Sequence, residues 1–384
     1  MHLGAPSQGA PSGRGRREAR HTAGTPLPAA SPLVKGRKNT DDAINLSFLL
    51  ETGDKRIDGY LQKWDAPNLV DMKRSIMHKL SPWTRLSIVG LTSFMLGCQN
   101  GSLVSESAAQ ETCEAQAGFV LIEGGEFLMG SDRPERDYAY RISAEGRADS
   151  PEEIPEAEAG FRERGWFDRE PERQVAELSA FCLGQNLITN ADYQRFVQAT
   201  GHESPGISAA DYQEQGFLVH DYSLVEPYIW QGDQYPAGQG MHPVVLISYE
   251  DAIAYVDWRS QEDGVSYRLP TAMEWEKAAR GTDGRYFPWG SEWRDEATNW
   301  SKNGPYGTSA IATYPDSRGP YGTEDMAGNV FEYTSTLVEK DSGNEVILKG
   351  CGWDDYPGFC RAAYQHDRPI DSKHVLFGFR LVLE

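Results

Sequence analysis

The chain is poor in cysteine and in positive charge. Only five cysteines occur among 384 residues, and 37 lysines and arginines stand against 57 aspartates and glutamates, so the formal net charge is −20 at pH 7. Nucleic-acid binding needs clustered lysine and arginine side chains that neutralise phosphates. We therefore expect no nucleic-acid partner, and we interpret the acidity mainly as an aid to solubility.

A membrane-spanning helix is not predicted at the most apolar stretch near the N-terminal third. Residues 86–97 form a run of about 12 residues, whereas a spanning helix needs about 20. Cys98 follows this run, and the basic side chains that precede it are Lys73, Arg74, Lys79 and Arg85. A basic region, a short apolar run and then a cysteine are the layout of a secretory signal.

The end of this signal resembles a bacterial lipobox. Met95, Leu96 and Gly97 lead to Cys98, with methionine where leucine is usual, and a lipobox cysteine is diacylated and becomes the mature N-terminus. Two acyl chains anchor a protein stably in a membrane. We expect Cys98 to carry them; the alternatives are an ordinary signal peptide and a short anchor helix. Because Gln99 is not the aspartate of inner-membrane retention, we expect the outer membrane, facing the periplasm.

These features divide the chain into four predicted parts. Residues 1–40 are rich in Gly, Pro, Ser, Ala and Arg, a composition that cannot offset the entropy of ordering. Because secretory signals also sit at N-termini, residues 1–71 are expected to be disordered or an over-extended gene start, with the true start at Met72 or Met77. Residues 72–98 form the signal, 99–117 a flexible tether, and 118–384 a folded domain.

The folded part predicts a single α+β domain with little regular secondary structure. The segment FVLIEGGEFLMGS, from residue 119, indicates a strand, a turn at Gly124 and Gly125, and a second strand. Residues 132–171 are charged and aperiodic, which indicates a surface insertion. After residue 281 turns, short strands and aromatic residues replace the helical patterns, as in other α+β arrangements.

Three short helices are predicted from their capping residues. Each begins with the spacing of a capping box, in the pairs Thr189 and Asp192, Ser248 and Asp251, and Thr271 and Glu274. Gly201 and Gly281 stand where the first and third helices should end, because glycine accepts the left-handed conformation common at that position.

Five motifs make this domain resemble a known family. In order they are RLPTAMEWEKAARG, FPWG, DMAGNVFEY, KGCGW and a terminal GFRLV. Their order and spacing resemble the formylglycine-generating enzymes, also called sulfatase-modifying factors, over roughly residues 119–384. The resemblance implies one compact domain of the sulfatase-modifying-factor fold, an elaborated C-type-lectin-like fold, with bound calcium.

The resemblance also implies a chemistry. The founding members oxidise a sulfatase cysteine to Cα-formylglycine with copper(I) held by two cysteine thiolates, the soft ligands that select this ion. Other members are iron-linked sulfoxide synthases, which use three histidines, and lipoproteins without demonstrated oxidase activity. The domain's histidines are scattered along the sequence, and we interpret them as ordinary core or surface residues: His202, His220, His242, His366 and His374.

The segment ILKGCGWDDYPGFC departs from the copper motif. By position, Cys360 stands at one thiolate site, Asp355 at the other, and Cys351 at a glycine site. A carboxylate is a hard ligand and a poor substitute for a thiolate on Cu(I). Three interpretations of Cys351 and Cys360 stay open: a disulfide, two inert buried thiols, or a copper or redox pair. Cys113 and Cys182 are a second candidate disulfide pair.

Calcium ligands transfer by position from the family. In DMAGNV the expected ligands are one carboxylate and three backbone carbonyls, those of Asp325, Met326, Gly328 and Val330. Hard oxygen donors on an irregular turn suit Ca²⁺, although a turn-capping role for the carboxylate is the alternative. A second site would use Asn299 and Trp300, on a loop shorter than that of strict members.

A substrate cleft is expected beside the altered copper motif. We place in it Asp354, Arg361, His366 and Arg368, together with the substituted Asp355. A different role is expected for Glu332 in DMAGNVFEY: because a buried carboxylate needs a partner, it should form an ion pair with Arg380 or Arg268.

Two functions compete on these grounds. The first is an exported lipoprotein whose domain binds a peptide, a glycan or a partner protein without oxidising it, which the lipid anchor and the missing thiolate favour. The second is a copper-dependent oxidase of a cysteine in an exported sulfatase or another protein, with Cys360 and Cys351 as ligands, which the retained Cys360 favours. Function follows the site rather than the fold, and we prefer the first.

Overall fold

Three β-sheets organise the residues that the computed structural model describes, which are 106–216, 220–340 and 343–384. One four-stranded sheet has the order β1-β4-β10-β5, another has the order β8-β7-β6-β9, and β2 pairs with β3 alone. The strands are β1 Phe119–Ile122, β2 Gly125–Met129, β3 Gln174–Leu178, β4 Phe181–Gly184, β5 Tyr267–Arg268, β6 Phe331–Lys340, β7 Gly343–Gly350, β8 Gln365–Pro369, β9 Phe377–Gly378 and β10 Val382–Leu383. Short sheets and long connections confirm the α+β prediction.

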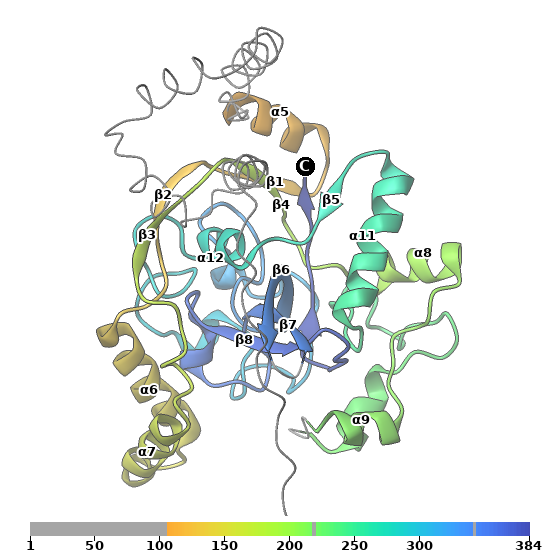
Figure 1. The fold of residues 1–384 in the computed structure, drawn as a ribbon. Coiled ribbons are helices and arrows are strands. Elements are labelled where there is room, and N and C mark those ends of the chain that lie inside the picture. The colour runs from red at the N-terminus through yellow and green to blue at the C-terminus, as the bar shows by residue number, and fades with distance from the viewer. Residues whose placement is uncertain (1–105, 217–219, 341–342) are drawn as a thin grey trace, which may run out of the picture. The chain divides into compact units, whose positions relative to one another are not determined.

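Helices flank these sheets (Figure 1). The α-helices are α5 Glu106–Ala115, α6 Arg133–Arg147, α7 Ile154–Arg164, α8 Asn190–Thr200, α9 Ala209–Gln215, α10 Tyr222–Val225, α11 Tyr249–Asp263 and α12 Ala272–Arg280. The 3₁₀ turns are Pro151–Glu153, Glu226–Tyr228, Asp295–Ala297, Pro315–Ser317 and Pro357–Cys360. As predicted, no α-helix follows α12 in the described residues.

The three predicted capping boxes are all present, at the starts of α8, α11 and α12. Thr271 illustrates the arrangement: its hydroxyl accepts the Glu274 N–H at 3.1 Å, and the Glu274 carboxylate accepts the Thr271 N–H at 2.7 Å. Two otherwise orphaned amides are thereby satisfied. Gly201 ends α8 in the left-handed conformation, with φ of 71°.

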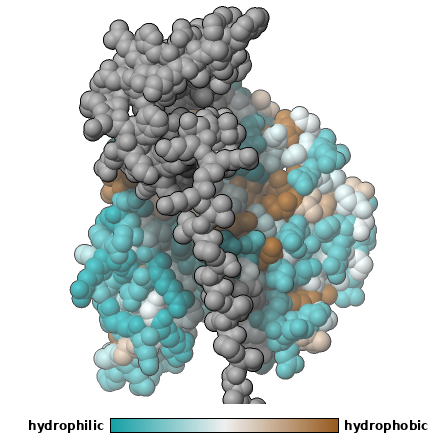
Figure 2. Space-filling model, viewed as in Figure 1, coloured by the Kyte–Doolittle hydropathy of each residue, from teal (hydrophilic) through white to brown (hydrophobic). Residues whose placement is uncertain are grey.

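The segment expected to be a surface insertion, residues 132–171, instead forms α6 and α7. Asp132 caps α6 through the Glu135 N–H, and a proline stands in the first turn of each helix, where its missing N–H costs nothing. The outer side of this pair is hydrophilic in Figure 2. Its inner side is apolar, because Tyr140 of α6 and Phe161 of α7 are buried, as is Phe167 just after α7. Charged outer faces concealed the apolar inner ones in the sequence.

Two boundaries near the start of the domain differ from expectation. The predicted flexible tether, residues 99–117, is wrong for Glu106–Ala115, which form α5. Cys113 in α5 forms a disulfide with Cys182 in β4, and a cross-link of this kind holds the helix to the sheet.

The predicted strands β1 and β2 are confirmed. They enter different sheets, however, rather than pairing with each other across the turn at Gly124.

The proposed signal and its lipobox-like end, Cys98 included, lie outside the described residues. Among the residues that the structure describes, no helix is long and apolar enough to cross a membrane.

Candidate functional site

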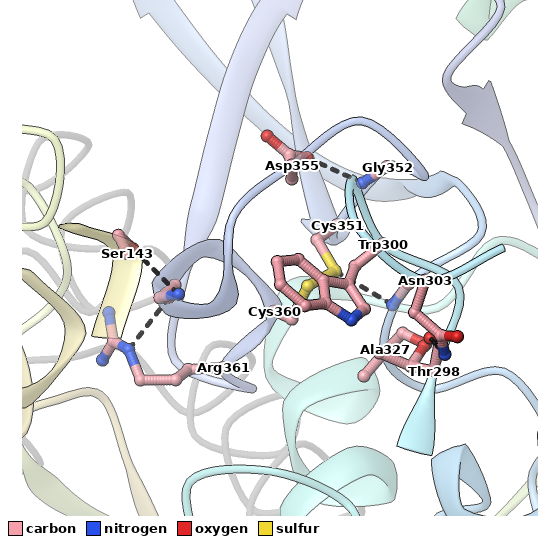
Figure 3. The surroundings of a disulfide bond; sticks show 12 residues. Ser143, Thr298, Trp300, Asn303, Ala327, Cys351, Gly352, Asp355, Cys360 and Arg361 are labelled. Atoms are coloured by element: carbon pink, nitrogen blue, oxygen red, sulfur yellow. Dashed lines mark hydrogen bonds between the residues drawn. A yellow bond between two sulfur atoms is a disulfide. The ribbon is translucent and has the colours of Figure 1, made fainter. Parts of the chain in front are cut away.

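The two cysteines of the altered motif form a disulfide (Figure 3). Cys351 follows the last residue of β7, and Cys360 ends the 3₁₀ turn Pro357–Cys360, so the chain returns until their Cα atoms are 4.8 Å apart. Their residues are 0% and 1% exposed, and the Gly328 N–H donates to Cys351 Sγ at 2.9 Å. The disulfide interpretation of this pair is confirmed, and neither sulfur is present as a thiolate.

Asp355 does not replace the missing thiolate. Its carboxylate is turned toward the Gly352 amide, whose N–H it accepts at 2.7 Å, rather than toward the two sulfur atoms (Figure 3). Burial, and then the neighbouring charge of Asp354, raise the pKa of Asp355 well above its usual range. A disulfide and a hard oxygen donor do not fit Cu(I), so the residues of this segment do not make a copper site.

A cavity of about 360 Å³ opens beside this loop. Four residues of the predicted cleft line it: Asp354, Asp355, His366 and Arg368. The other lining residues are Phe161, Arg164, Trp166, His220, Tyr306, Phe331, Tyr356, Phe359, Tyr364, His374, Leu376 and Phe377. Neither cysteine is among them, so the disulfide lies behind the cavity wall rather than in it.

Arg361 was predicted in the cleft, and that prediction is wrong. Its side chain is 0% exposed. The guanidinium donates to Oε1 of Glu135, in α6, at 3.1 Å and to both carboxylate oxygens of Glu170, which follows α7. Burial lowers the pKa of a guanidinium, but the two glutamates outweigh it and hold the pKa of Arg361 above its usual value. Arg361 therefore joins α6 and α7 to the disulfide segment from inside the core.

Further buried ions extend this network to α12. Glu135 also accepts from Arg280 Nη2 at 3.2 Å, and Glu276 pairs with Arg280 at 2.9 Å and with Lys349 at 3.1 Å. Burying ions is costly unless each has a partner, and here each carboxylate faces at least one cation. The 3₁₀ turn Pro357–Cys360 also packs closely against α6, because a Cβ at Gly358 would overlap Ser143 of that helix.

Three of the scattered histidines meet in the cavity, which the sequence did not show. His220, His366 and His374 all line it, and the ring centres of His220 and His374 are 5.9 Å apart. Burial lowers the pKa of His374 to about 3 and that of His366 well below its usual range. Within the described residues, however, no three His, Cys, Asp or Glu side chains are arranged to hold a metal ion.

The hydrogen atoms of His374 can be assigned from its surroundings. The Leu376 N–H donates to His374 Nδ1 at 3.3 Å, so Nδ1 is the acceptor and the neutral ring carries its proton on Nε2. The residue is 2% exposed, and Nε2 has no hydrogen-bond partner in the part of the chain described. The ring therefore offers one unused N–H donor at the cavity.

Asp354 offers an unused acceptor on the same wall. Its side chain is 9% exposed, and Oδ2 lies 3.1 Å from His220 Nε2. The other oxygen, Oδ1, is buried and finds no hydrogen-bond partner among the described residues. His220 is held in place by stacking on Trp353 at 5.0 Å. A buried oxygen without a hydrogen-bond partner costs stability. Binding sites commonly contain such oxygens, because a ligand supplies the missing partner.

The predicted calcium turn has the expected geometry in part. Asp325 is 2% exposed, and both it and Asn329 have positive φ, 54° and 67°. Burial raises the pKa of Asp325 to about 6, and the Ala312 N–H, which donates to it at 2.8 Å, offsets only part of this effect. An incompletely compensated buried carboxylate on an irregular turn fits a hard cation. A Cβ at Gly328 would overlap Thr298 and Asn299, so the turn requires glycine there.

The second predicted calcium segment packs against the same turn. The Asn329 N–H donates to the Asn299 carbonyl at 3.0 Å, and Asn299 Oδ1 is buried with no protein partner in the region described. The Trp300 carbonyl already accepts the Asn303 N–H at 2.9 Å. Asn299 Oδ1 is thus the better candidate ligand of the two, and carbonyl and amide oxygens would have to supply most of the coordination.

The predicted ion pair of Glu332 is confirmed with one of its two candidate partners. Arg380 Nε and Nη2 donate to the two oxygens of Glu332 at 2.6 and 2.7 Å, and both side chains are 0% exposed. Arg268 pairs instead with Glu274 at 2.7 Å. The Arg380 pair ties the C-terminal GFRLV motif to the start of β6.

An α+β domain with short sheets, an irregular turn with a buried carboxylate and a two-cysteine segment beside a cleft is of the formylglycine-generating type. The chain belongs to the family of sulfatase-modifying factor enzyme 1-like domains, because residues 104–384 match the family model. This confirms the family and the fold that the motifs predicted.

The relatives include proteins named as formylglycine-generating enzymes and proteins named as inactive ones. The chain is similar to an inactive Cα-formylglycine-generating enzyme 2 of Bos taurus, with 34% identity over 62% of this chain and 76% of the relative. It is also similar to a formylglycine-generating enzyme of Bos taurus, with 27% identity over 68% and 73%. Among solved structures, PvdO from Pseudomonas aeruginosa shares the fold at a TM-score of 0.50 and 18% identity, over 69% of this chain and 94% of PvdO.

Proposed function

We propose that this chain is a non-oxidising member of the family, which binds a peptide, a glycan or a partner protein in the cavity beside Asp354. The Cys351–Cys360 disulfide carries the proposal, because it removes the only retained copper thiolate from use. Asp355, at the other thiolate position, accepts a backbone N–H instead. Some relatives of this chain are named as inactive, so a member of this family without the oxidase activity has precedent.

The proposal includes export and anchoring. A disulfide in the domain suits an oxidising compartment, and the described residues contain two, Cys113–Cys182 and Cys351–Cys360. The signal-like segment ending at Cys98 would deliver the chain there, with the lipid on Cys98 holding it to the outer membrane on the periplasmic side. Calcium at Asp325 would then act as a structural ion that stabilises the folded state by binding to it.

The experiment that tests the missing oxidase site is a copper competition. The full chain is titrated with Cu(I) against a chromogenic chelator, first as isolated and then after reduction. Because both sulfurs are at most 1% exposed and lie outside the cavity lining, we expect no stoichiometric complex in either state. Incubation with a cysteine-containing sulfatase peptide, read by mass spectrometry, should leave the cysteine unchanged.

Two variants make the titration decisive. Cys360→Ala removes the retained family thiol, and Cys113→Ala, its control, opens the other disulfide of the same domain. A one-to-one Cu(I) complex in wild type and in Cys113→Ala that is lost in Cys360→Ala would contradict the proposal and support the copper oxidase. Equal background binding in all three proteins would support it.

A further inference from the structure

The cavity has one acidic group whose charge is not fully used by the protein. Asp354 is only 9% exposed, yet its Oδ1 atom has no partner within the described residues, while Oδ2 faces His220 Nε2 at 3.1 Å. A buried charged oxygen in this state favours a ligand that can donate a hydrogen bond to it. The group that would fill this position is therefore a donor, and a cationic donor would gain most.

Aromatic rings form much of the remaining wall. Tyr306, Tyr356, Phe359 and Trp166 all line the cavity, and the Tyr306 ring lies 5.0 Å from that of Trp353. Aromatic faces attract cations and also accept the apolar stem of a lysine-type side chain. Rings and a carboxylate together favour an organic cation over a neutral or an anionic ligand.

The positive groups near the cavity do not cancel this preference. Arg368 lies on the wall, where burial lowers the pKa of its guanidinium and Tyr364 and Glu345 act on its charge in the opposite sense; its Nη1 donates to the Asp367 carbonyl at 2.8 Å. Arg164 is exposed to solvent at the rim, where water screens it. His366 and His374 have pKa values lowered by burial, so both are neutral at pH 7.

The geometry distinguishes an ammonium from a guanidinium. A guanidinium is a planar fork that binds both oxygens of a carboxylate, whereas an ammonium is a compact donor that needs only one. In Asp354 the His220 ring lies against Oδ2, with Nε2 at 3.1 Å but without a hydrogen bond, so Oδ1 is the oxygen left for a donor. The available acceptor therefore matches a single N–H of a primary ammonium.

We infer that the cavity binds the primary ammonium group of a lysine side chain in a peptide, with the ammonium on Asp354 and a peptide carbonyl on the His374 Nε2–H. This names the ligand of the site proposed above and rests on that proposal. The net charge of −20 also favours a basic peptide, because it attracts one at long range.

The test is calorimetry on the full chain with four small probes. Nα-acetyl-lysinamide carries the ammonium and a carbonyl; Nα-acetyl-norleucinamide is its neutral isostere; Nα-acetyl-argininamide carries the fork; and n-butylamine is the free amine. We expect lysinamide to bind saturably and norleucinamide to bind at least tenfold more weakly. Argininamide should bind several-fold more weakly than lysinamide, because its planar guanidinium does not match a single acceptor oxygen. n-Butylamine should also bind several-fold more weakly, because it has no carbonyl to accept from His374.

A pair of matched variants tests the carboxylate. Asp354→Asn keeps the shape and removes the charge, and should weaken lysinamide binding at least tenfold. Asp367→Asn changes a carboxylate of the neighbouring strand β8 that pairs with Lys340 instead, and should leave binding within twofold. Circular dichroism of both variants shows whether they are folded, and the comparison of probes on the wild type needs no variant.

The inference is overturned if norleucinamide binds as well as lysinamide, if no probe binds, or if Asp354→Asn has no effect. Tighter binding of argininamide would overturn the choice of ammonium, and equally tight binding of n-butylamine would overturn the choice of a peptide. These failures are separate from failure of the proposed function, which would appear as copper binding lost in Cys360→Ala.

Discussion

Replacing Arg361 with methionine should destabilise the domain strongly and leave the cavity intact. The guanidinium is 0% exposed and donates to Glu135, Glu170 and the Gly358 carbonyl. Methionine has a similar stem and no charge, so the change removes the ion pairs and keeps most of the packing. Glu135 retains Arg280 and Arg173, but Glu170 loses the only cation that pairs with it in the described residues.

The expected magnitude follows from this loss. Breaking a buried pair by removing one partner costs about 3–5 kcal/mol, because the other charge stays buried. For a domain of this size each 1 kcal/mol lowers the melting temperature by roughly 2–4 °C, so the decrease should be about 6–20 °C. Adding Glu170→Met to Arg361→Met should recover much of it, since an apolar pair of similar volume replaces the ions well.

Differential scanning calorimetry of the full chain measures these differences. The matched control is Arg294→Met, because Arg294 forms an ion pair with Asp316 in which both side chains are more than 40% exposed. An exposed pair contributes at most about 1 kcal/mol. If Arg361→Met melts at the same temperature as the control and binds lysinamide more weakly, Arg361 does not stabilise the core through buried ion pairs. It would then be a residue of the cleft, as the sequence predicted.

Two further predictions concern the disulfides and the calcium turn. Replacing Cys113 and Cys182 by alanine should cost about 4.4 kcal/mol in loop entropy and replacing Cys351 and Cys360 about 2.6 kcal/mol, from loops of 69 and 9 residues; calorimetry that shows the reverse order would contradict this. For Asp325 the folded pKa, about 6, exceeds the unfolded value of 3.8, so the folded state binds more protons between these values. Calcium-free stability should therefore fall on the order of 3 kcal/mol as the pH rises from 4 to 7, and calcium should reverse the fall; a flat profile that calcium does not alter would contradict it.

The features that the sequence predicted well are those with local causes. Capping boxes at Thr189, Ser248 and Thr271 join residues three positions apart, and all three helices begin there. The ion pair of Glu332 was predictable because a buried carboxylate requires a cation, although the choice of Arg380 over Arg268 depends on tertiary packing. The five ordered motifs were sufficient for the family and the fold.

The features that the sequence missed depend on distant residues. Glu135 and Glu170 looked like surface charges in a charged insertion, yet they neutralise Arg361, which is 226 positions from Glu135. Their only local signal was the aromatic residues around them, since Tyr140 and Phe167 indicate a buried face. Arg361 was misplaced for the same reason: its neighbours in sequence line the cavity, but its own side chain points into the core.

The cavity shows the same limit in another form. Asp354, Asp355, His366 and Arg368 were predicted together because they are close in sequence. His220 and His374 come from segments more than 100 positions apart and looked like ordinary histidines. Spacing in the sequence could not bring them together, because only tertiary packing does so: His220 stacks on Trp353, and its ring centre lies 5.9 Å from that of His374.

The state of Cys351 and Cys360 in the natural protein tests the central claim most directly. The full chain is recovered from cell envelopes, its free thiols are blocked at once, and it is digested without reduction for peptide mass mapping. We predict a linked peptide pair joining Cys351 to Cys360, and a second pair joining Cys113 to Cys182. Blocked, unlinked Cys351 and Cys360 would contradict the claim that this site has lost its copper chemistry to a structural disulfide.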